Sequence, residues 1–116
     1  YRRSLESLGL YDPELTEHTR PLPEAAGNAL RLLLARTMPD AIFVAGDHQV
    51  PYIEKVLKGK GMRLPVVGCD GLSFAAWPTV ALPRRAAGEA AARMLVARLR
   101  GGITPEQTVL PSRFVC

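Results

Sequence analysis

The chain has 116 residues and a net charge of +4, and 47% of its residues are hydrophobic while 22% are charged. This length corresponds to about one domain and allows a core to form without disulfides or a structural metal. No apolar run approaches the roughly 18–20 residues of a membrane-spanning helix, and Cys69 and Cys116 lie in no metal or redox spacing. The sequence therefore predicts an ordinary globular protein that does not cross a membrane and carries two reduced thiols.

Basic residues concentrate in the second half of the chain. A surface that binds nucleic acid is one explanation, and exposed helix faces of an Ala/Arg-rich protein are the other. No aromatic residues interleave with the bases, and no zinc-finger, RNA-binding or helix-turn-helix pattern is present. The pattern favours solvated helix faces.

The first third of the chain predicts two helices separated by a turn-rich segment. Residues 1–9 are typical of the end of an amphipathic helix, which Gly9 stops. The Asp12-Pro13 pair indicates a turn. Residues 22–37 predict a longer helix, because leucines and alanines recur at helical spacing along one face.

The middle of the chain predicts a strand, a helix and a second strand. The run "AIFVA", residues 41–45, is continuously apolar and bounded by turn residues, as expected of a strand buried on both faces of a parallel sheet. Residues 49–60 predict a helix with one apolar side and one side that carries lysines. The run "LPVVGCD", residues 64–70, predicts another buried strand that ends in an acid.

The last third predicts a strand, a helix and a final strand. A loop leads to a short strand near 79–81, and residues 84–100 predict a helix with apolar side chains inward and arginines outward. The closing run "TVLPSRFVC" predicts a strand. Alternating helices and strands indicate an α/β fold with a parallel sheet and right-handed crossovers. Ligands of such sheets bind at the carboxyl ends of the strands.

Two acidic residues follow predicted strands, and both are expected at that ligand-binding edge. Asp47 can accept hydrogen bonds from ligand hydroxyls or ring N–H groups, or it can cap the helix that begins near residue 49. The sequence leaves these two roles open. For Asp70 the pattern favours a turn carboxylate that accepts hydrogen bonds from backbone N–H groups in the next loop.

His48 and Trp77 are further candidates for ligand contact. His18 lies at no metal-ligand spacing from His48, so a solvated loop histidine is favoured. Trp77 precedes Pro78 and is expected to anchor its loop on the sheet, with stacking on a ligand as the alternative. No G-x-S-x-G, P-loop or G-x-G-x-x-G motif is present, so we expect no catalytic residues, no metal and no cofactor.

Four segments resemble LacI/GalR-type transcriptional repressors, and the resemblance runs along essentially the whole chain. They are "PDAIFVAGD", "VVGCD", "PTVALPRRAAGEAAARMLVARL" and the final "LPSRFV", in the family's order and spacing. The resemblance implies the periplasmic-binding-protein type I fold, a parallel-sheet α/β sandwich, and mostly its C-terminal lobe. Residues 1–116 would then be a fragment, and the DNA-binding domain and most of the N-terminal lobe would precede it.

The resemblance also implies site residues. Asp47 matches the family's carboxylate that hydrogen-bonds a small-molecule effector. Leu22 falls where many members place an aromatic side chain that stacks on the ligand. Gly46 stands where Asn is usual, and Gly71 stands where a second Asp is usual. These departures leave the fold intact but hide the identity of the effector.

The implied function is the effector-sensing and dimerisation part of a DNA-binding transcriptional regulator in the cytoplasm. A sugar or nucleoside-like effector would shift operator affinity, and operator DNA would be contacted only through the missing N-terminal domain. The helix at 49–60 contributes to the family's dimer interface, which points to Tyr52 and Val56 in a homodimer. The alternative is a solute (sugar)-binding protein of the same fold. An α/β enzyme has less support, because only His48 lies near Asp47 as a possible base.

Overall fold

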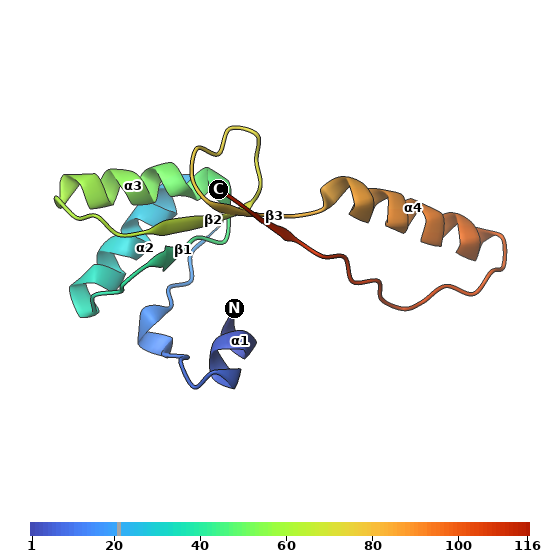
Figure 1. Cartoon of the computed structure of the whole chain (residues 1–116), viewed down its shortest axis with the longest axis horizontal. Coiled ribbons are helices and arrows are strands. Elements are labelled where there is room, and N and C mark those ends of the chain that lie inside the picture. The colour runs from blue at the N-terminus through green and yellow to red at the C-terminus, as the bar shows by residue number, and fades with distance from the viewer. Residues whose placement is uncertain (21) are drawn as a thin grey trace.

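The computed structural model describes residues 1–20 and 22–116, and its elements follow the predicted order (Figure 1). In chain order they are α1 (Arg2–Ser7), η1 (Pro13–Leu15), α2 (Pro23–Arg36), β1 (Ile42–Phe43), η2 (Asp47–Gln49), α3 (Val50–Gly59), β2 (Val66–Asp70), β3 (Thr79–Ala81), α4 (Arg84–Leu99) and β4 (Arg113–Val115). Every predicted helix and strand is present, but β1 and β4 are shorter than the runs that predicted them. Here η denotes a single 3₁₀ turn.

The strands form one sheet in the order β1-β2-β3-β4. The first three run parallel, with Ile42 paired to Val66 and Gly68 paired to Thr79. The last strand runs antiparallel to β3 and places Val115 opposite Thr79. The expectation of a parallel sheet is therefore confirmed for three strands and wrong for β4. The chain returns from the far end of α4 alongside β3, which sets the opposite direction of β4 (Figure 1).

The core lies where α2 and α3 pack together beside the sheet. Its buried apolar residues are Ala26, Leu30 and Leu33 of α2, Val44 after β1, and Val50, Ile53, Val56 and Leu57 of α3. The predicted apolar faces of both helices are confirmed, because residues three and four apart share one helix face. The two helices are in contact at Gly27, where a Cβ would lie 3.4 Å from Cγ2 of Val56, an ordinary van der Waals distance.

The strand β1 is shorter and more exposed than its sequence predicts. Val44 is buried, but Ala41 and Ala45 are exposed and Phe43 is 46% exposed. The interpretation of residues 41–45 as a strand buried on both faces is therefore wrong. The cause is that one face of β1 packs on the helices, whereas Phe43 on the other face is stacked on the ring of Tyr1, with 6.1 Å between the centroids, and stays partly exposed.

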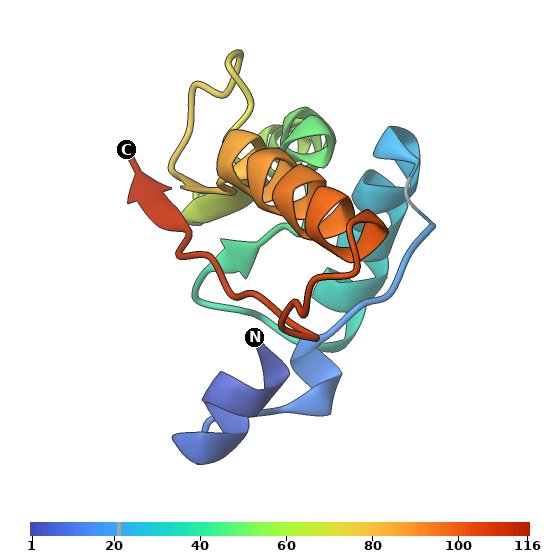
Figure 2. The same cartoon turned by 90° about the vertical axis from the view of Figure 1, so that its right-hand side faces the viewer.

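Helix α4 extends away from the layer formed by α2 and α3 (Figures 1 and 2). The expected inward apolar face is wrong: α4, which is described in full, buries no residue, and Leu95 and Leu99 are 60% and 78% exposed. The helix occupies the far end of the connection between β3 and β4, where no second layer covers it. Accordingly, the radius of gyration is 17.8 Å, against about 13 Å for a compact chain of this length.

Both cysteines are free thiols; Cys69 is half-buried and Cys116 is exposed. Burial raises the pKa of the Cys69 thiol, and the carboxylates of Asp70 and Asp47 raise it further, against a smaller opposing effect of Arg84. Cys69 is thus a protonated, weakly nucleophilic thiol. Within residues 1–20 and 22–116, the helices are all too short or too polar to cross a lipid bilayer.

Candidate functional site

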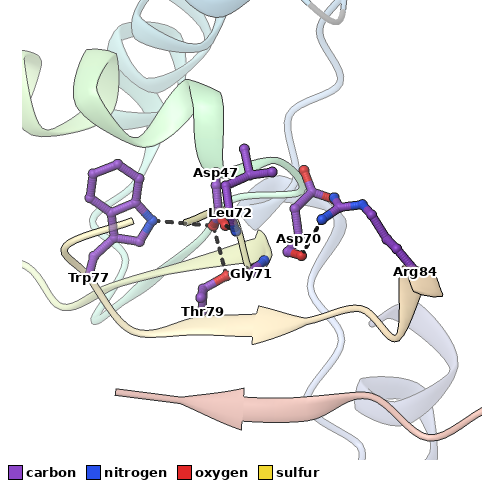
Figure 3. A network of polar contacts seen from close by, with 7 residues as sticks. All are labelled: Asp47, Asp70, Gly71, Leu72, Trp77, Thr79 and Arg84. Atoms are coloured by element: carbon purple, nitrogen blue, oxygen red, sulfur yellow. Dashed lines mark hydrogen bonds and ion pairs between the residues drawn. The ribbon is translucent and has the colours of Figure 1, made fainter. Parts of the chain in front are cut away.

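The carboxyl ends of β1 and β2 bring two acidic residues to the same edge of the sheet. The strands are parallel neighbours, so Asp47 in η2 and Asp70 at the end of β2 reach this edge together. The segment 71–78 connects β2 to β3 and brings Leu72 and Trp77 to Asp47 (Figure 3). This is the edge at which the sequence predicts a ligand site.

Asp47 is 0% exposed and forms the centre of a hydrogen-bond network (Figure 3). Its Oδ1 accepts hydrogen bonds from Thr79 Oγ1 at 2.8 Å and from Trp77 Nε1 at 3.2 Å. Its Oδ2 accepts one from the backbone N–H of Leu72 at 2.8 Å. A buried carboxylate requires donors of this kind, because unmet lone pairs are costly away from water. The network fixes the segment between β2 and β3 to the end of β1.

The network also sets the charge of Asp47. Burial alone would raise the pKa of this carboxyl. The hydrogen bonds from Leu72, Thr79 and Trp77, together with the nearby backbone N–H of Gly71, outweigh burial and hold the pKa of Asp47 below its ordinary value. Asp47 is therefore an ionised carboxylate in the folded protein.

Two glycines make this arrangement possible. A Cβ on Gly68 of β2 would collide with Asp47 Oδ1 and would lie 2.8 Å from Trp77 Nε1. Gly71 has a φ of +66°, and a Cβ there would lie 2.5 Å from the Cβ of Ala81. The positive φ and the close approach of Ala81 in β3 together explain why glycine stands at position 71.

The two roles considered for Asp47 fare differently from expectation. The capping role is wrong, because neither η2 nor α3 has a side-chain hydrogen bond at its N-cap, which is Gly46 or Gln49 respectively. The ligand-binding role would require the segment above Asp47 to move, because all three of its hydrogen bonds go to residues 72–79. In this structure Asp47 holds the segment 72–79 against the end of β1 through these hydrogen bonds.

Asp70 is the accessible carboxylate of this edge, and its partner is a side chain rather than the backbone N–H groups expected from the sequence. Arg84 Nη2 lies 3.0 Å from Asp70 Oδ1, and the two side chains are 51% and 23% exposed. Arg84 Nη1 also donates to the backbone oxygen of Asp70 at 2.7 Å. Among the described residues, Asp70 is the one non-glycine with a positive φ, 129°. Such strained backbone clusters at functional sites.

Sequence reasoning missed the pairing of Asp70 with Arg84, which lie fourteen residues apart in the chain. One signal was present. Arg84 and Arg85 open helix α4, and no acidic residue accompanies them in its first turn. Cations at a helix N-terminus oppose the helix dipole, so an external carboxylate was to be expected nearby.

The other predicted ligand-binding residues do not meet in one cavity. His48 is exposed and lines a cavity of about 600 Å³ between α2, β1 and residues 15–19. Leu22, the N-cap residue of α2, is 48% exposed and does not line that cavity. Trp77 is half-buried and donates to Asp47, as expected of a loop anchor. Its ring meets Phe74 edge-on, with 6.3 Å between the centroids.

The two residues expected at a dimer interface have different surroundings. Tyr52 is 39% exposed on α3 and is available to a partner. Val56 is 5% exposed and packs in the core beside Gly27, so it must be removed from the expected interface. The cause is the helical period, because Val56 shares the inward face of α3 with Ile53. In the part of the chain that the structure describes, no three His, Cys, Asp or Glu residues are grouped to hold a metal ion.

Comparison with known proteins gives a family and a fold. The Escherichia coli transcriptional repressor ascG matches with a TM-score of 0.82 and 19% identity. A LacI-family sugar-binding transcriptional regulator from Escherichia coli, complexed with phosphate, matches with a TM-score of 0.84 and 19% identity. Each alignment covers 100% of this chain and 46% of the other.

A third structure, a LacI family transcriptional regulator from Enterococcus faecium with bound ribose, has a TM-score of 0.67 and 18% identity over 98% of this chain and 46% of that one. The chain thus spans less than half the length of the regulators that it resembles, and at such identities the likeness establishes the fold. No curated protein sequence matches the chain. The model of the periplasmic binding protein-like domain family matches residues 1–115. Because this match covers nearly the whole chain, the protein belongs to the periplasmic binding protein-like domain family.

Proposed function

We propose that this chain is the effector-sensing and dimerisation part of a LacI/GalR-type transcriptional regulator. The family match supports a ligand-binding domain, and the three similar structures are all named as transcriptional regulators or repressors. One of them contains ribose and one contains phosphate, which favours a small polar effector. We place the regulator in the cytoplasm and assign it no catalytic activity.

The observation that carries this proposal is the strained, solvent-accessible carboxylate at the carboxyl edge of the sheet. Asp70 has a φ of 129°, and its side chain is 23% exposed. An ionised carboxylate accepts up to about four hydrogen bonds, and Arg84 supplies one to Oδ1. Asp70 therefore retains capacity for the hydroxyl or ring N–H groups of a sugar or nucleoside-like effector.

Within this proposal Asp47 has a supporting role. It ties the segment 72–79 to the end of β1 and so fixes the start of the loop that follows Asp70. His48, Leu22 and Trp77 remain candidate contacts around this edge. Each is at least partly accessible, but we rank Asp70 ahead of all three because its geometry is strained and its partner is polar.

The mechanism that we propose is a shift between two populations of the regulator. An effector bound at the carboxyl edge of the sheet would draw this lobe and the other lobe of the regulator together. This closure would change the geometry of a homodimer and so alter the affinity of a separate DNA-binding domain for operator DNA. The exposed side of α3, with Tyr52, is our proposed dimer surface.

A thermal-shift screen on the intact protein tests the proposal. D-Ribose, D-glucose, D-galactose and adenosine are suitable probes, because a ligand that binds only the folded state raises the unfolding temperature. We expect at least one of them to stabilise the protein in proportion to its concentration. If none stabilises the protein at millimolar concentration, the effector class is wrong. A stabilising sugar without any effect on binding to DNA upstream of the gene would favour the solute-binding alternative.

A further inference from the structure

Asp70 and Arg84 place opposite charges side by side at the carboxyl edge of the sheet (Figure 3). Arg84 Nη2 lies 3.0 Å from Oδ1 of Asp70, and Arg84 Nη1 donates to the backbone oxygen of Asp70 at 2.7 Å. The two side chains come from different elements, since Asp70 ends β2 and Arg84 begins α4. A negatively charged acceptor and a positively charged donor are therefore presented together at this edge.

The guanidinium of Arg84 is oriented by Asp70 but not saturated by it. A guanidinium has more N–H donors than the two contacts to Asp70 use. The side chain is 51% exposed, so the remaining donors are accessible. Contacts at two nitrogens hold a planar guanidinium in orientation as well as in distance. Arg84 thus presents a pre-oriented donor group at the edge.

Asp70 keeps an acceptor atom beside this donor group. Arg84 engages Oδ1 and the backbone oxygen of Asp70, whereas Oδ2 has no hydrogen-bond partner among the described residues. The other carboxylate of the edge, Asp47, is fully buried, and its hydrogen bonds are made within the protein. The charged groups that this edge offers to a ligand are therefore Asp70 as acceptor and Arg84 as donor.

This pair of groups matches a ligand that has a hydroxyl or N–H group close to an acidic group. The hydroxyl or N–H group donates to Oδ2 of Asp70. The oxygens of a carboxylate or phosphate accept from Arg84, and these are the groups that a planar guanidinium binds best. A neutral sugar offers Arg84 only hydroxyl oxygens, which accept weaker hydrogen bonds than an ionised group does.

We propose that Arg84 determines the chemical class of the effector, and that the effector carries a carboxylate or phosphate beside its hydroxyl groups. Sugar acids, sugar phosphates and nucleotides share this chemistry. Because Arg84 contacts both Asp70 and the acidic group of the ligand, it offsets the repulsion between these two negative charges. This inference rests on the proposed function, because it takes Asp70 as the effector contact.

Calorimetric titration of the intact protein with matched neutral and acidic ligands tests the inference. The pairs are D-galactose with D-galacturonate, D-glucose with D-glucuronate, and adenosine with adenosine monophosphate, so that carboxylate and phosphate are distinguished. The proteins are the wild type, Arg84→Met, and Arg85→Met as the matched control. Arg85 has the same charge and the neighbouring position, but its side chain is 93% exposed and pairs with Glu89.

The quantity that decides is the ratio of the two Kd values within a pair. In the wild type and in Arg85→Met, the acidic member of at least one pair should bind about tenfold or more tightly than its neutral partner. In Arg84→Met the order should reverse, because Asp70 then repels the acidic group without compensation. Continued binding of the neutral member by Arg84→Met shows that this variant is folded.

Three results would overturn the inference. If Arg84→Met loses the same factor of affinity for both members of a pair, Arg84 only orients Asp70 and does not contact the acidic group. If the wild type binds each neutral member at least as tightly as its acidic partner, the class of effector is wrong, although the proposed function stands. If no ligand of either kind binds, the proposed function fails and the inference fails with it.

Discussion

Replacement of Asp47 by alanine should destabilise the protein strongly, although Asp47 belongs to no regular strand or helix core. The carboxylate is 0% exposed and accepts three hydrogen bonds. A hydrogen bond to a charged group contributes about 1.5–3 kcal/mol to the free energy of unfolding. The bond from Thr79 is buried and is lost in full, whereas the donors of Leu72 and Trp77 are part-buried and can turn partly to water.

Counting the Thr79 bond in full and the other two at half strength gives a gross loss of about 3–6 kcal/mol. Removal of a buried charge returns part of its desolvation cost. We therefore expect Asp47→Ala to lower the free energy of unfolding by about 3 kcal/mol, which is a large share of the stability of a typical domain.

Urea denaturation measures this loss, and the chain contains its own probe. Trp77 is the single tryptophan, and its indole N–H donates to Asp47, so its fluorescence reports on the network directly. Circular dichroism followed in parallel tests whether unfolding is two-state. Asp40→Ala is the control, because Asp40 is exposed at the opposite end of β1, and it should change the free energy by less than about 0.5 kcal/mol. If Asp47→Ala is as stable as Asp40→Ala, the network does not hold the sheet edge.

Three further predictions follow from the same contacts. The pKa of Asp47 is lowered in the folded state, so the carboxylate stabilises the fold above its unfolded pKa of about 4, and this stabilisation is lost as the pH falls through the folded pKa. The urea midpoints of the wild type and of Asp47→Ala should therefore converge at acid pH. A difference between the two midpoints that stays constant with pH would contradict this. Gly68→Ala should cost about 2–3 kcal/mol, because its Cβ collides with Asp47 Oδ1, and a blue or red shift of the tryptophan emission should accompany the loss; an unperturbed spectrum and midpoint would refute the packing argument. Val56→Ala should lower the free energy of unfolding by about 2 kcal/mol, because Val56 lies in the core, and should leave self-association unchanged. Tyr52→Ala should weaken the proposed dimer in sedimentation equilibrium with little change in the stability of the monomer. The reverse pattern would exchange the roles of the two residues.

The sequence predicts the part of the fold that is built from local periodicity. Leu30 and Leu33 of α2, like Ile53 and Leu57 of α3, repeat at helical spacing and are buried as expected. The end of β2 at Asp70 is predicted in the same way, whereas β1 ends at Phe43, two residues before the end of its apolar run. These local signals placed two carboxylates at the carboxyl edge of the sheet correctly.

The errors come from features that no local pattern encodes. Helix α4 has apolar residues such as Leu95 and Leu99 at suitable spacing, but whether they are buried depends on a second layer, which this structure does not place over them. The exposure of Phe43 has the same origin, because its environment depends on which element covers β1.

The roles of the two carboxylates also depend on long-range contacts. Asp47 is bound by donors 25 to 32 residues later in the chain, at Leu72, Trp77 and Thr79. Family resemblance gives Asp47 the role of effector contact, but it does not show that the side chain is covered in this chain. The positive φ of Asp70 and its bond to Arg84 are properties of the folded backbone. Only the unusual pair of arginines at the start of a helix indicated that contact in advance.

The most direct test of the central claim is the affinity of Asp70→Asn for the sugar or nucleoside that stabilises the intact protein most, measured by isothermal titration calorimetry. Loss of one charge-assisted contact of about 1.5–3 kcal/mol raises Kd by roughly 10- to 100-fold. Asp40→Asn, an exposed carboxylate at the other end of β1, is the matched control and should bind like the wild type. The account predicts a Kd raised at least about tenfold for Asp70→Asn alone; equal affinities in the two variants and the wild type would show that the effector does not bind at this edge of the sheet.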